Sequence, residues 1–277
     1  MQNDISRRCF LAAAGSVTLA SPLASQVQKA STLPVKKEDK SALPLIEKRV
    51  EKVFMAPGQH PNDLETVADG LWILDQADPN KAHKVTWDGK TIFAEVQTEV
   101  MHGSGIAWWD NALWISSTAS GPCPTCLMTM KVDPKTGKTL QMWQSPGSVE
   151  ARLGRPGRTP GQAPTPGGSH GIKFKDGYYW QASPPSIMIY KVEPATGKVV
   201  YVIPAPGKRP HGLAWENGFL WCVESNDRAI YKMDPETGDL LAKIQLTRED
   251  PTPHGLTIKD GVLWYCDADS RWVCRLV

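Results

Sequence analysis

Histidine is the residue type that could carry chemistry in this chain, because an imidazole binds transition metals and moves protons near neutral pH. Three of the six histidines, His170, His211 and His254, each start the same short pattern, in which glycine and then isoleucine or leucine follow. Three imidazoles from three copies of one pattern could surround a common centre and leave an open coordination position, as a catalytic metal requires. The pattern therefore predicts a site for zinc, copper or iron.

Two earlier copies of the pattern carry Asn62 and Ser104 at the equivalent position, and His60 and His102 stand two residues before them. A spacing of two keeps side chains on one side of an extended chain. We therefore expect these four residues to face the same space and to contact a substrate. A purely structural role competes with the metal hypothesis, since glycine permits close packing at an axis and the imidazole could hydrogen-bond to a neighbouring strand.

Acidic residues occupy a second repeated position, three residues after a repeated tryptophan. Asp75, Glu224 and Asp267 stand there in three copies, and serine stands there in the other two. A carboxylate beside an imidazole can orient it as a metal ligand or act as a general base. We expect these carboxylates to lie at the same mouth as the histidines and to serve in one of these two roles.

The elements that must position these residues come from a repeat of about forty residues, a period typical of propellers and solenoids. In each of five copies a tryptophan follows a leucine or isoleucine by eight residues, as Trp72 follows Leu64. The hairpin residues between them predict two strands, and a second turn, such as Asp133 to Gly137, predicts two more. Four strands per copy predict a blade, and five copies predict an all-β, five-bladed β-propeller. We expect the repeated tryptophans to pack between blades.

The N-terminal part of the propeller is expected to complete the last blade. The last copy ends at Val277 after three expected strands, and an unpaired outer edge would promote aggregation. Residues 50–58 resemble residues 199–207, which stand at the fourth-strand position of another copy. We therefore expect a propeller over residues 45–277 that is closed by an N-terminal strand, preceded by a linker over residues 31–44.

An insertion of about two dozen residues, 145–168, separates the second and third copies and contains Arg152, Arg155 and Arg158. Long loops inside compact domains are usually functional lids or floppy segments. As a lid, this loop would bring its arginines to a carboxylate or phosphate of a substrate.

Cys123 and Cys126 stand in a shorter insertion, between the expected second and third strands of the second copy. A Cys-x-x-Cys pair can form a disulfide, a redox pair or half of a metal site. An oxidising compartment favours the disulfide.

The first residues predict export. Ser6-Arg7-Arg8-Cys9-Phe10-Leu11, followed by an apolar run, has the form of a twin-arginine signal. We expect a signal peptide over residues 1–30, recognition by the twin-arginine export machinery, and a periplasmic or secreted protein. The apolar run is too short for a stable membrane span. Lysine and arginine number 31 against 29 acidic residues, so no strong field favours nucleic acid.

The Pro-His-Gly-Leu motifs at residues 210–213 and 253–256, with an Asp-Gly hairpin and an Asp-Pro-x-Thr-Gly turn, resemble a propeller superfamily. It includes streptogramin B lyase, the regucalcin-like gluconolactonases and the YncE-like proteins. The resemblance implies a metal-assisted site at the channel mouth, acting on a cyclic ester by elimination or hydrolysis, and matches His211, His254 and Glu224 to the lyase site. Those lyases have seven blades and those lactonases six. The five-bladed plant-type glutaminyl cyclases are also similar, although Pro-Asn-Asp-Leu at residues 61–64 replaces their Phe-Thr-Gln-Gly-Leu.

Together these observations predict a periplasmic metal-dependent enzyme that acts on a small anionic molecule by lyase or hydrolase chemistry. A copper or iron oxidoreductase at the same site is one alternative. A non-catalytic propeller that binds a ligand or a protein partner is another.

Overall fold

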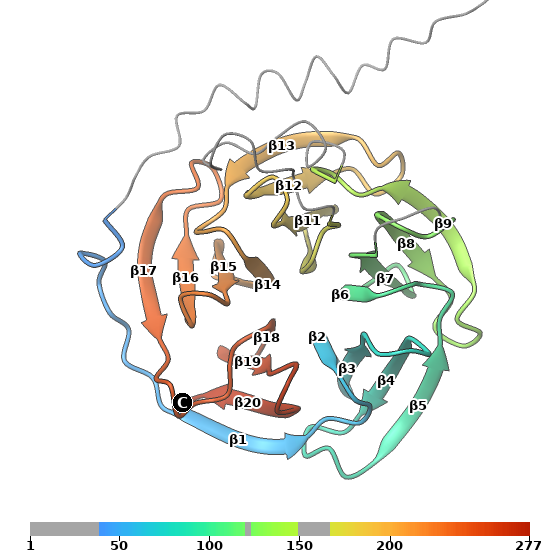
Figure 1. The fold of residues 1–277 in the computed structure, drawn as a ribbon, viewed down its shortest axis with the longest axis horizontal. Helices are drawn as coiled ribbons and strands as arrows, with labels where there is room; N and C mark the ends of the chain where they lie inside the picture. Colours follow the sequence, from blue (N-terminus) through green and yellow to red (C-terminus); the bar gives the residue numbers. More distant parts are fainter. Residues whose placement is uncertain (1–38, 120–122, 149–166) are drawn as a thin grey trace, which may run out of the picture.

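The computed structural model describes residues 39–119, 123–148 and 167–277. The regular elements in these residues are twenty β-strands, which form five separate four-stranded antiparallel sheets around a central axis (Figure 1). The predicted all-β, five-bladed propeller is therefore confirmed.

Blades one to four each contain four consecutive strands that run outward from the axis in chain order. Blade one contains β2 (Pro61–Val67), β3 (Gly70–Asp75), β4 (Lys81–Val85) and β5 (Ile92–Gln97). Blade two contains β6 (Gly103–Trp109), β7 (Ala112–Ser117), β8 (Met128–Val132) and β9 (Thr139–Gln144). Blade three contains β10 (Ile172–Lys175), β11 (Tyr178–Ser183), β12 (Met188–Val192) and β13 (Val199–Pro204). Blade four contains β14 (Pro210–Glu216), β15 (Phe219–Glu224), β16 (Ala229–Met233) and β17 (Leu240–Gln245).

Blade five joins the two ends of the propeller. Its inner strands are β18 (Gly255–Lys259), β19 (Val262–Cys266) and β20 (Trp272–Leu276), and its outer strand is β1 (Val50–Met55). β1 pairs antiparallel with β20, and Val50 lies opposite Leu276. The predicted closure by an N-terminal strand is confirmed, and it covers the edge that β20 would otherwise expose.

The residues just before β1 also contact the propeller. The backbone of Lys243 in β17 donates to the carbonyl of Pro44 and accepts from the amide of Ile46, and Lys40 forms an ion pair with Asp227. The last residues of the predicted linker therefore run along blade four, where the outer edge of β17 offers unpaired backbone groups. The rest of that predicted linker and the predicted signal peptide lie outside the described residues.

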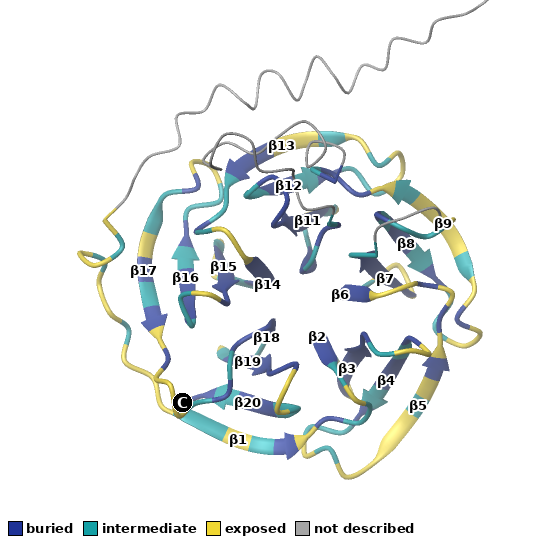
Figure 2. Ribbon diagram, viewed as in Figure 1, coloured by how far each residue is buried: buried dark blue, intermediate teal, exposed yellow. Residues whose placement is uncertain are grey.

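Burial follows the position of a strand in its blade. Every residue of the second strand β3 is buried, whereas the outer strands β5, β9 and β13 each contain exposed residues (Figure 2). The repeated tryptophans are at most 5% exposed, and Trp72 stacks on Trp108 of the next blade. They pack between blades, as expected from their size.

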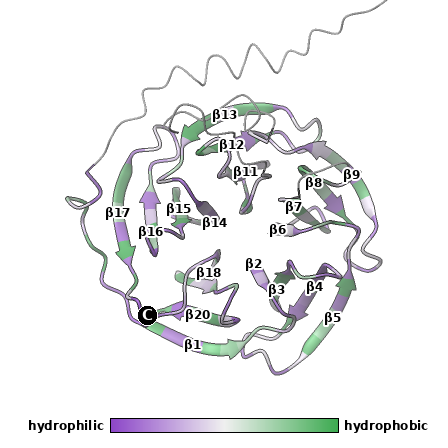
Figure 3. Cartoon of the chain, viewed as in Figure 1, coloured by the Kyte–Doolittle hydropathy of each residue, from purple (hydrophilic) through white to green (hydrophobic). Residues whose placement is uncertain are grey.

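The innermost strands approach one another closely at the axis. A Cβ atom added to Gly171 would lie 2.3 Å from the carbonyl oxygen of His211, and one added to Gly212 would lie 2.2 Å from the amide of Leu256. Only glycine permits this close approach. The residue before each glycine is thereby presented to the axis. Hydrophilic residues lie beside the axis in β2 and β14 (Figure 3).

Within the described residues, the structure contains no helix long and apolar enough to cross a bilayer.

Candidate metal centre

His170, His211 and His254 meet at one end of the central channel. Each stands at or just before the start of an innermost strand, and one ring nitrogen from each lies within 4.8 Å of those of the other two. The ring centroid of His211 is 4.1 Å from that of His170 and 4.0 Å from that of His254. The repeat thus brings together three histidines from three consecutive blades.

Backbone oxygens determine which ring nitrogen carries the hydrogen in two of these imidazoles. His211 Nδ1 lies 2.8 Å from the carbonyl oxygen of Arg209, and His254 Nδ1 lies 2.9 Å from the carbonyl oxygen of Asn62. A carbonyl oxygen can only accept a hydrogen bond, so Nδ1 must carry the hydrogen in both rings. In the neutral form of each ring, Nε2 then holds the lone pair.

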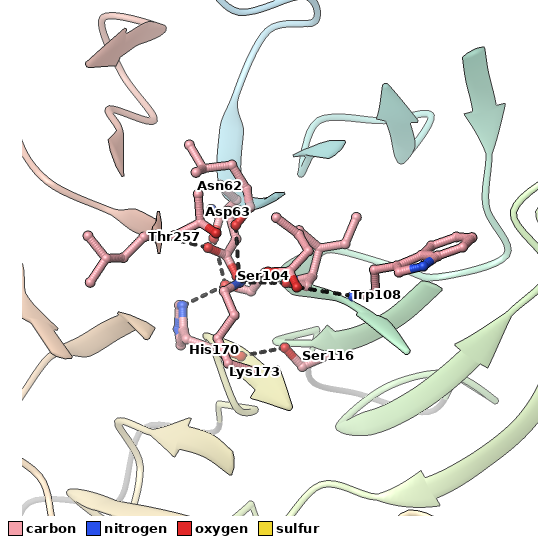
Figure 4. A network of polar contacts seen from close by, with 12 residues as sticks. Asn62, Asp63, Ser104, Trp108, Ser116, His170, Lys173 and Thr257 are labelled. Carbon is pink, nitrogen blue, oxygen red and sulfur yellow. Dashed lines mark hydrogen bonds and ion pairs between the residues drawn. The ribbon is translucent and has the colours of Figure 1, made fainter. Parts of the chain in front are cut away.

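A hydroxyl relay fixes the proton of the third imidazole (Figure 4). Ser104 donates its hydroxyl hydrogen to Asn62 Oδ1 at 2.7 Å, and its Oγ lies 2.5 Å from His170 Nδ1. Because the hydroxyl has one hydrogen, its oxygen must accept from His170 Nδ1. All three rings therefore hold their Nδ1 hydrogen toward an oxygen and have Nε2 left for another ligand.

The electrostatics of the cluster favour neutral rings. Burial lowers the pKa of His170 and of His211 well below the usual value and lowers the pKa of His254 to about 4. His211 Nε2 is buried without a hydrogen-bond partner. An unpaired buried polar atom costs about 1–3 kcal/mol, which a bound ion would offset.

This donor set fits a transition metal. Neutral imidazole nitrogens are the ligands that zinc, copper and iron accept. His170, His211 and His254 would hold such an ion through one ring nitrogen each.

We expected Asp75, Glu224 and Asp267 to lie beside the imidazoles. Among the described residues, no hydrogen bond joins these carboxylates to His170, His211 or His254. Each carboxylate instead accepts backbone hydrogen bonds from the loop that leads into the innermost strand of its own blade, at 2.8 Å from the His60 amide, 2.8 Å from the Arg209 amide and 3.0 Å from the Thr252 amide. These carboxylates stand in the second strand of their blades, one strand away from the axis, and their expected role in orienting the imidazoles or as a general base remains a prediction. Burial raises the pKa of Glu224.

Glu224 nevertheless acts on the cluster through one residue. It accepts from the amide of Arg209, and the carbonyl of Arg209 accepts from His211 Nδ1. The residue whose carbonyl orients His211 is thus held in turn by a carboxylate.

The residues expected to contact a substrate fall into two groups. Asn62 and Ser104 are 2% and 1% exposed and bind the imidazoles, so they are partners of the cluster. His60 is half-buried and His102 is exposed, which leaves both near open space. His102 has a left-handed backbone with φ of 54°, and its Nδ1 lies 2.8 Å from Thr118 Oγ1. The loop arginines Arg152, Arg155 and Arg158 lie outside the described residues.

Sequence reasoning missed a buried ionic cluster below the histidines (Figure 4). Lys173 Nζ lies 3.3 Å from Asp63 Oδ2, 3.1 Å from Glu65 Oε2 and 2.7 Å from the carbonyl oxygen of Ile106. Asp63 also accepts from the amides of Ile106 and Leu256, in blades two and five. The signal was present in the repeat, because Asp63 stands where the other four copies have glycine.

Arg209 is a second residue that sequence reasoning missed. It is exposed and stands two residues before His211. After the larger effects of burial and the neighbouring imidazole, its positive charge further lowers the pKa of His170. The mouth therefore carries a fixed cation among the described residues.

The cysteines lie apart from this chemistry. Cys123 and Cys126 form a disulfide in the connection from β7 to β8. Cys222, Cys266 and Cys274 are buried free thiols, so the pairing of Cys266 with Cys274 that their neighbouring strands permitted is not made.

Comparisons with known proteins show a likeness of fold. No family model and no curated protein matches the chain. The structure of a glutaminyl cyclase from Myxococcus xanthus has a TM-score of 0.61 and 10% identity, over 84% of this chain and 97% of that chain. A streptogramin B lyase has a TM-score of 0.48 and 14% identity, over 83% and 97% of the two chains. Virginiamycin B lyase from Staphylococcus aureus has a TM-score of 0.45 and 18% identity, over 80% and 67%. The likeness to the cyclase agrees with the propeller fold.

Proposed function

We propose that this protein is a periplasmic metal-dependent enzyme that acts on a small anionic molecule by lyase or hydrolase chemistry. His170, His211 and His254 would hold the metal through Nε2. The observation that carries the proposal is the common orientation of these rings, each with Nδ1 bound to an oxygen and one ring nitrogen within 4.8 Å of the others. The periplasmic location rests on the twin-arginine motif at the N-terminus.

The charges at the mouth support an anionic substrate. The three imidazoles are neutral ligands, so a bound divalent ion would keep its full positive charge, and the exposed Arg209 stands beside it. A guanidinium binds a carboxylate or phosphate through paired hydrogen bonds. We propose that Arg209 holds the anionic group of the substrate.

Proton transfer would fall to the histidines above the cluster. A metal in this position polarises a carbonyl or lowers the pKa of a bound water. Asp75, Glu224 and Asp267 are committed to backbone amides, which gives them a positioning role in this proposal. His60 and His102 are the less buried imidazoles near the mouth, and either could accept a proton.

Metal content of the protein tests the proposal. Protein purified from the periplasm without a histidine tag should contain about one equivalent of zinc, copper or iron by elemental analysis. His211→Ala should remove the metal and leave the circular dichroism spectrum unchanged, whereas His102→Gln should keep the metal. Unchanged metal in His211→Ala would exclude this site.

The identity of the metal separates the proposal from its redox alternative. The same three nitrogens suit a copper or iron oxidoreductase, because imidazole is a ligand of all these ions. Zinc would direct assays to lactones and other cyclic esters, and copper or iron would direct them to oxidation.

A further inference from the structure

A cavity of about 470 Å³ lies between blades three and four, at the end of the molecule opposite to the histidines. The turns from β10 to β11, from β14 to β15 and from β16 to β17 contribute to it, whereas the histidines stand at the other ends of the innermost strands. Its walls include Trp180, Trp215, Lys191, Tyr201 and Pro235.

The turn beside this cavity carries proline, as do the equivalent turns of blades two and three, whereas blade one carries tryptophan. In blade one the residue equivalent to Pro235 is Trp87, whose ring packs 6.0 Å from that of Trp264 in blade five. Between blades three and four, Trp180 and Trp215 meet edge to face at 5.3 Å, and the small ring of Pro235 leaves the space beside them open.

A cation in this cavity has no anionic partner among the described residues. In each blade a lysine or arginine of the third strand lies opposite the repeated tryptophan of the second strand. In four blades this cation forms an ion pair: Lys84 with Asp69, Lys131 with Asp110, Lys232 with Glu216 and Arg275 with Glu51. In blade three, Lys191 instead lies over aromatic rings, 4.5 Å from the centroid of Tyr178 and 5.7 Å from that of Trp180. Its charge is available to a ligand.

The cavity thus offers an ammonium group that lacks an anionic partner in the described part of the chain. Its rim carries Asp176, which is paired with Lys175, and the exposed Glu236, so a ligand with a second negative charge is disfavoured.

We propose that this cavity binds a small monoanionic aromatic carboxylate, with its carboxylate on Lys191 and its ring against the indoles of Trp180 and Trp215. Aromatic walls with a few placed polar groups are typical of small-molecule sites, and an ion pair set among apolar walls is stronger than one in water. The site is separate from the histidine cluster and does not depend on the metal.

Binding of naphthalene-2-carboxylate, followed by calorimetry and tryptophan fluorescence, tests the site. The uncharged probe 2-naphthalenemethanol should bind at least tenfold more weakly. Lys191→Met should weaken binding of the carboxylate by about tenfold or more, because it removes the charge-assisted hydrogen bond. Pro235→Trp should abolish binding, because the new indole would fill the cavity as Trp87 fills the junction of blades five and one.

Lys131→Met is the matched control, since it removes the equivalent cation of blade two and should leave binding unchanged. Treatment with a chelator should also leave binding unchanged, which separates this site from the proposed enzyme activity. If Pro235→Trp does not fold, Lys191→Met decides. Lack of binding to the native protein, equal binding of the uncharged probe, or native affinity in Lys191→Met would each overturn the proposal.

Discussion

At the scale of single residues, the histidine cluster depends on the direction of a few hydrogen bonds. Asn62 serves two of the three imidazoles, because its carbonyl accepts from His254 Nδ1 and its side-chain oxygen accepts from Ser104, which in turn accepts from His170 Nδ1. Such partners set the tautomer and the ring orientation of a metal ligand. The two copies of the repeat that lack histidine at this position therefore still contribute to the site.

Ser104→Ala tests this relay. The substitution removes the acceptor of His170 Nδ1, so the ring can rotate or change tautomer, and we expect metal affinity to fall about 10–100-fold. Competition with a chromophoric chelator measures the affinity. Ser117→Ala is the control, because Ser117 Oγ donates to the carbonyl of Met101 and bonds no imidazole. Equal affinity in the two variants would contradict the role of Ser104.

The sixth histidine, His83, is a different case. It lies in β4 and is 2% exposed. Its Nδ1 lies 3.5 Å from Glu95 Oε2, and neither ring nitrogen makes a hydrogen bond within the described residues. Burial lowers its pKa in the folded protein. The unfolded chain therefore binds a proton below about pH 6.5 that the folded protein rejects, so this residue destabilises the fold increasingly as pH falls.

We expect His83→Met to stabilise the protein by about 1 kcal/mol at pH 7.5, because it removes an unpaired buried polar group. The equivalent residue in blade two is Met130, which is fully buried. The gain should be larger at pH 5.5, for the linkage reason just given. Urea unfolding at both pH values measures it, and a gain that shrinks on acidification would show that His83 is protonated in the folded state.

At the scale of elements, the innermost strands hold the blades together through the axis. Lys173 in β10 bonds Asp63 and the carbonyl of Leu64 in β2 and the carbonyl of Ile106 in β6, and Asp63 accepts from Leu256 in β18. Four of the five blades are thus joined by one buried ionic cluster. It fills the axis below the histidines and links the elements that present them.

Lys173→Met should be strongly destabilising. It leaves the carboxylates of Asp63 and Glu65 without their cation, and breaking a buried ion pair in this way costs about 3–5 kcal/mol. Lys131→Met breaks a partly exposed pair with Asp110 and should cost about 0–1 kcal/mol. Urea unfolding compares the two variants. Similar losses in both would mean that the axial cluster contributes no more than a surface pair.

At the scale of the whole molecule, the N-terminal strand joins the two ends of the ring. β1 supplies the fourth strand of blade five, and residues 39–46 continue along blade four, so the N-terminal region contacts two neighbouring blades. This arrangement leaves the edge of β20 covered. The site at the axis is therefore supported by contacts on the rim, because each blade is held in place by its neighbours.

The sequence by itself determined the number of blades, their four strands, the closing strand and the three histidines that share one position. These features are periodic or local, so turn residues and the spacing of tryptophans were enough to predict them. The export signal and the arginine loop remain predictions from sequence.

Only the tertiary structure decided which atoms meet. Asn62 and His254 are 192 residues apart, and no local pattern indicates that a backbone carbonyl of one fixes the proton of the other. The same holds for Asp75, Glu224 and Asp267. The repeat predicted the end of the molecule at which they lie, but it did not predict that their partners are loop amides. Hydrogen-bond partners depend on distances of a few tenths of an ångström between distant segments, and the spacing of residues along a chain does not contain that information.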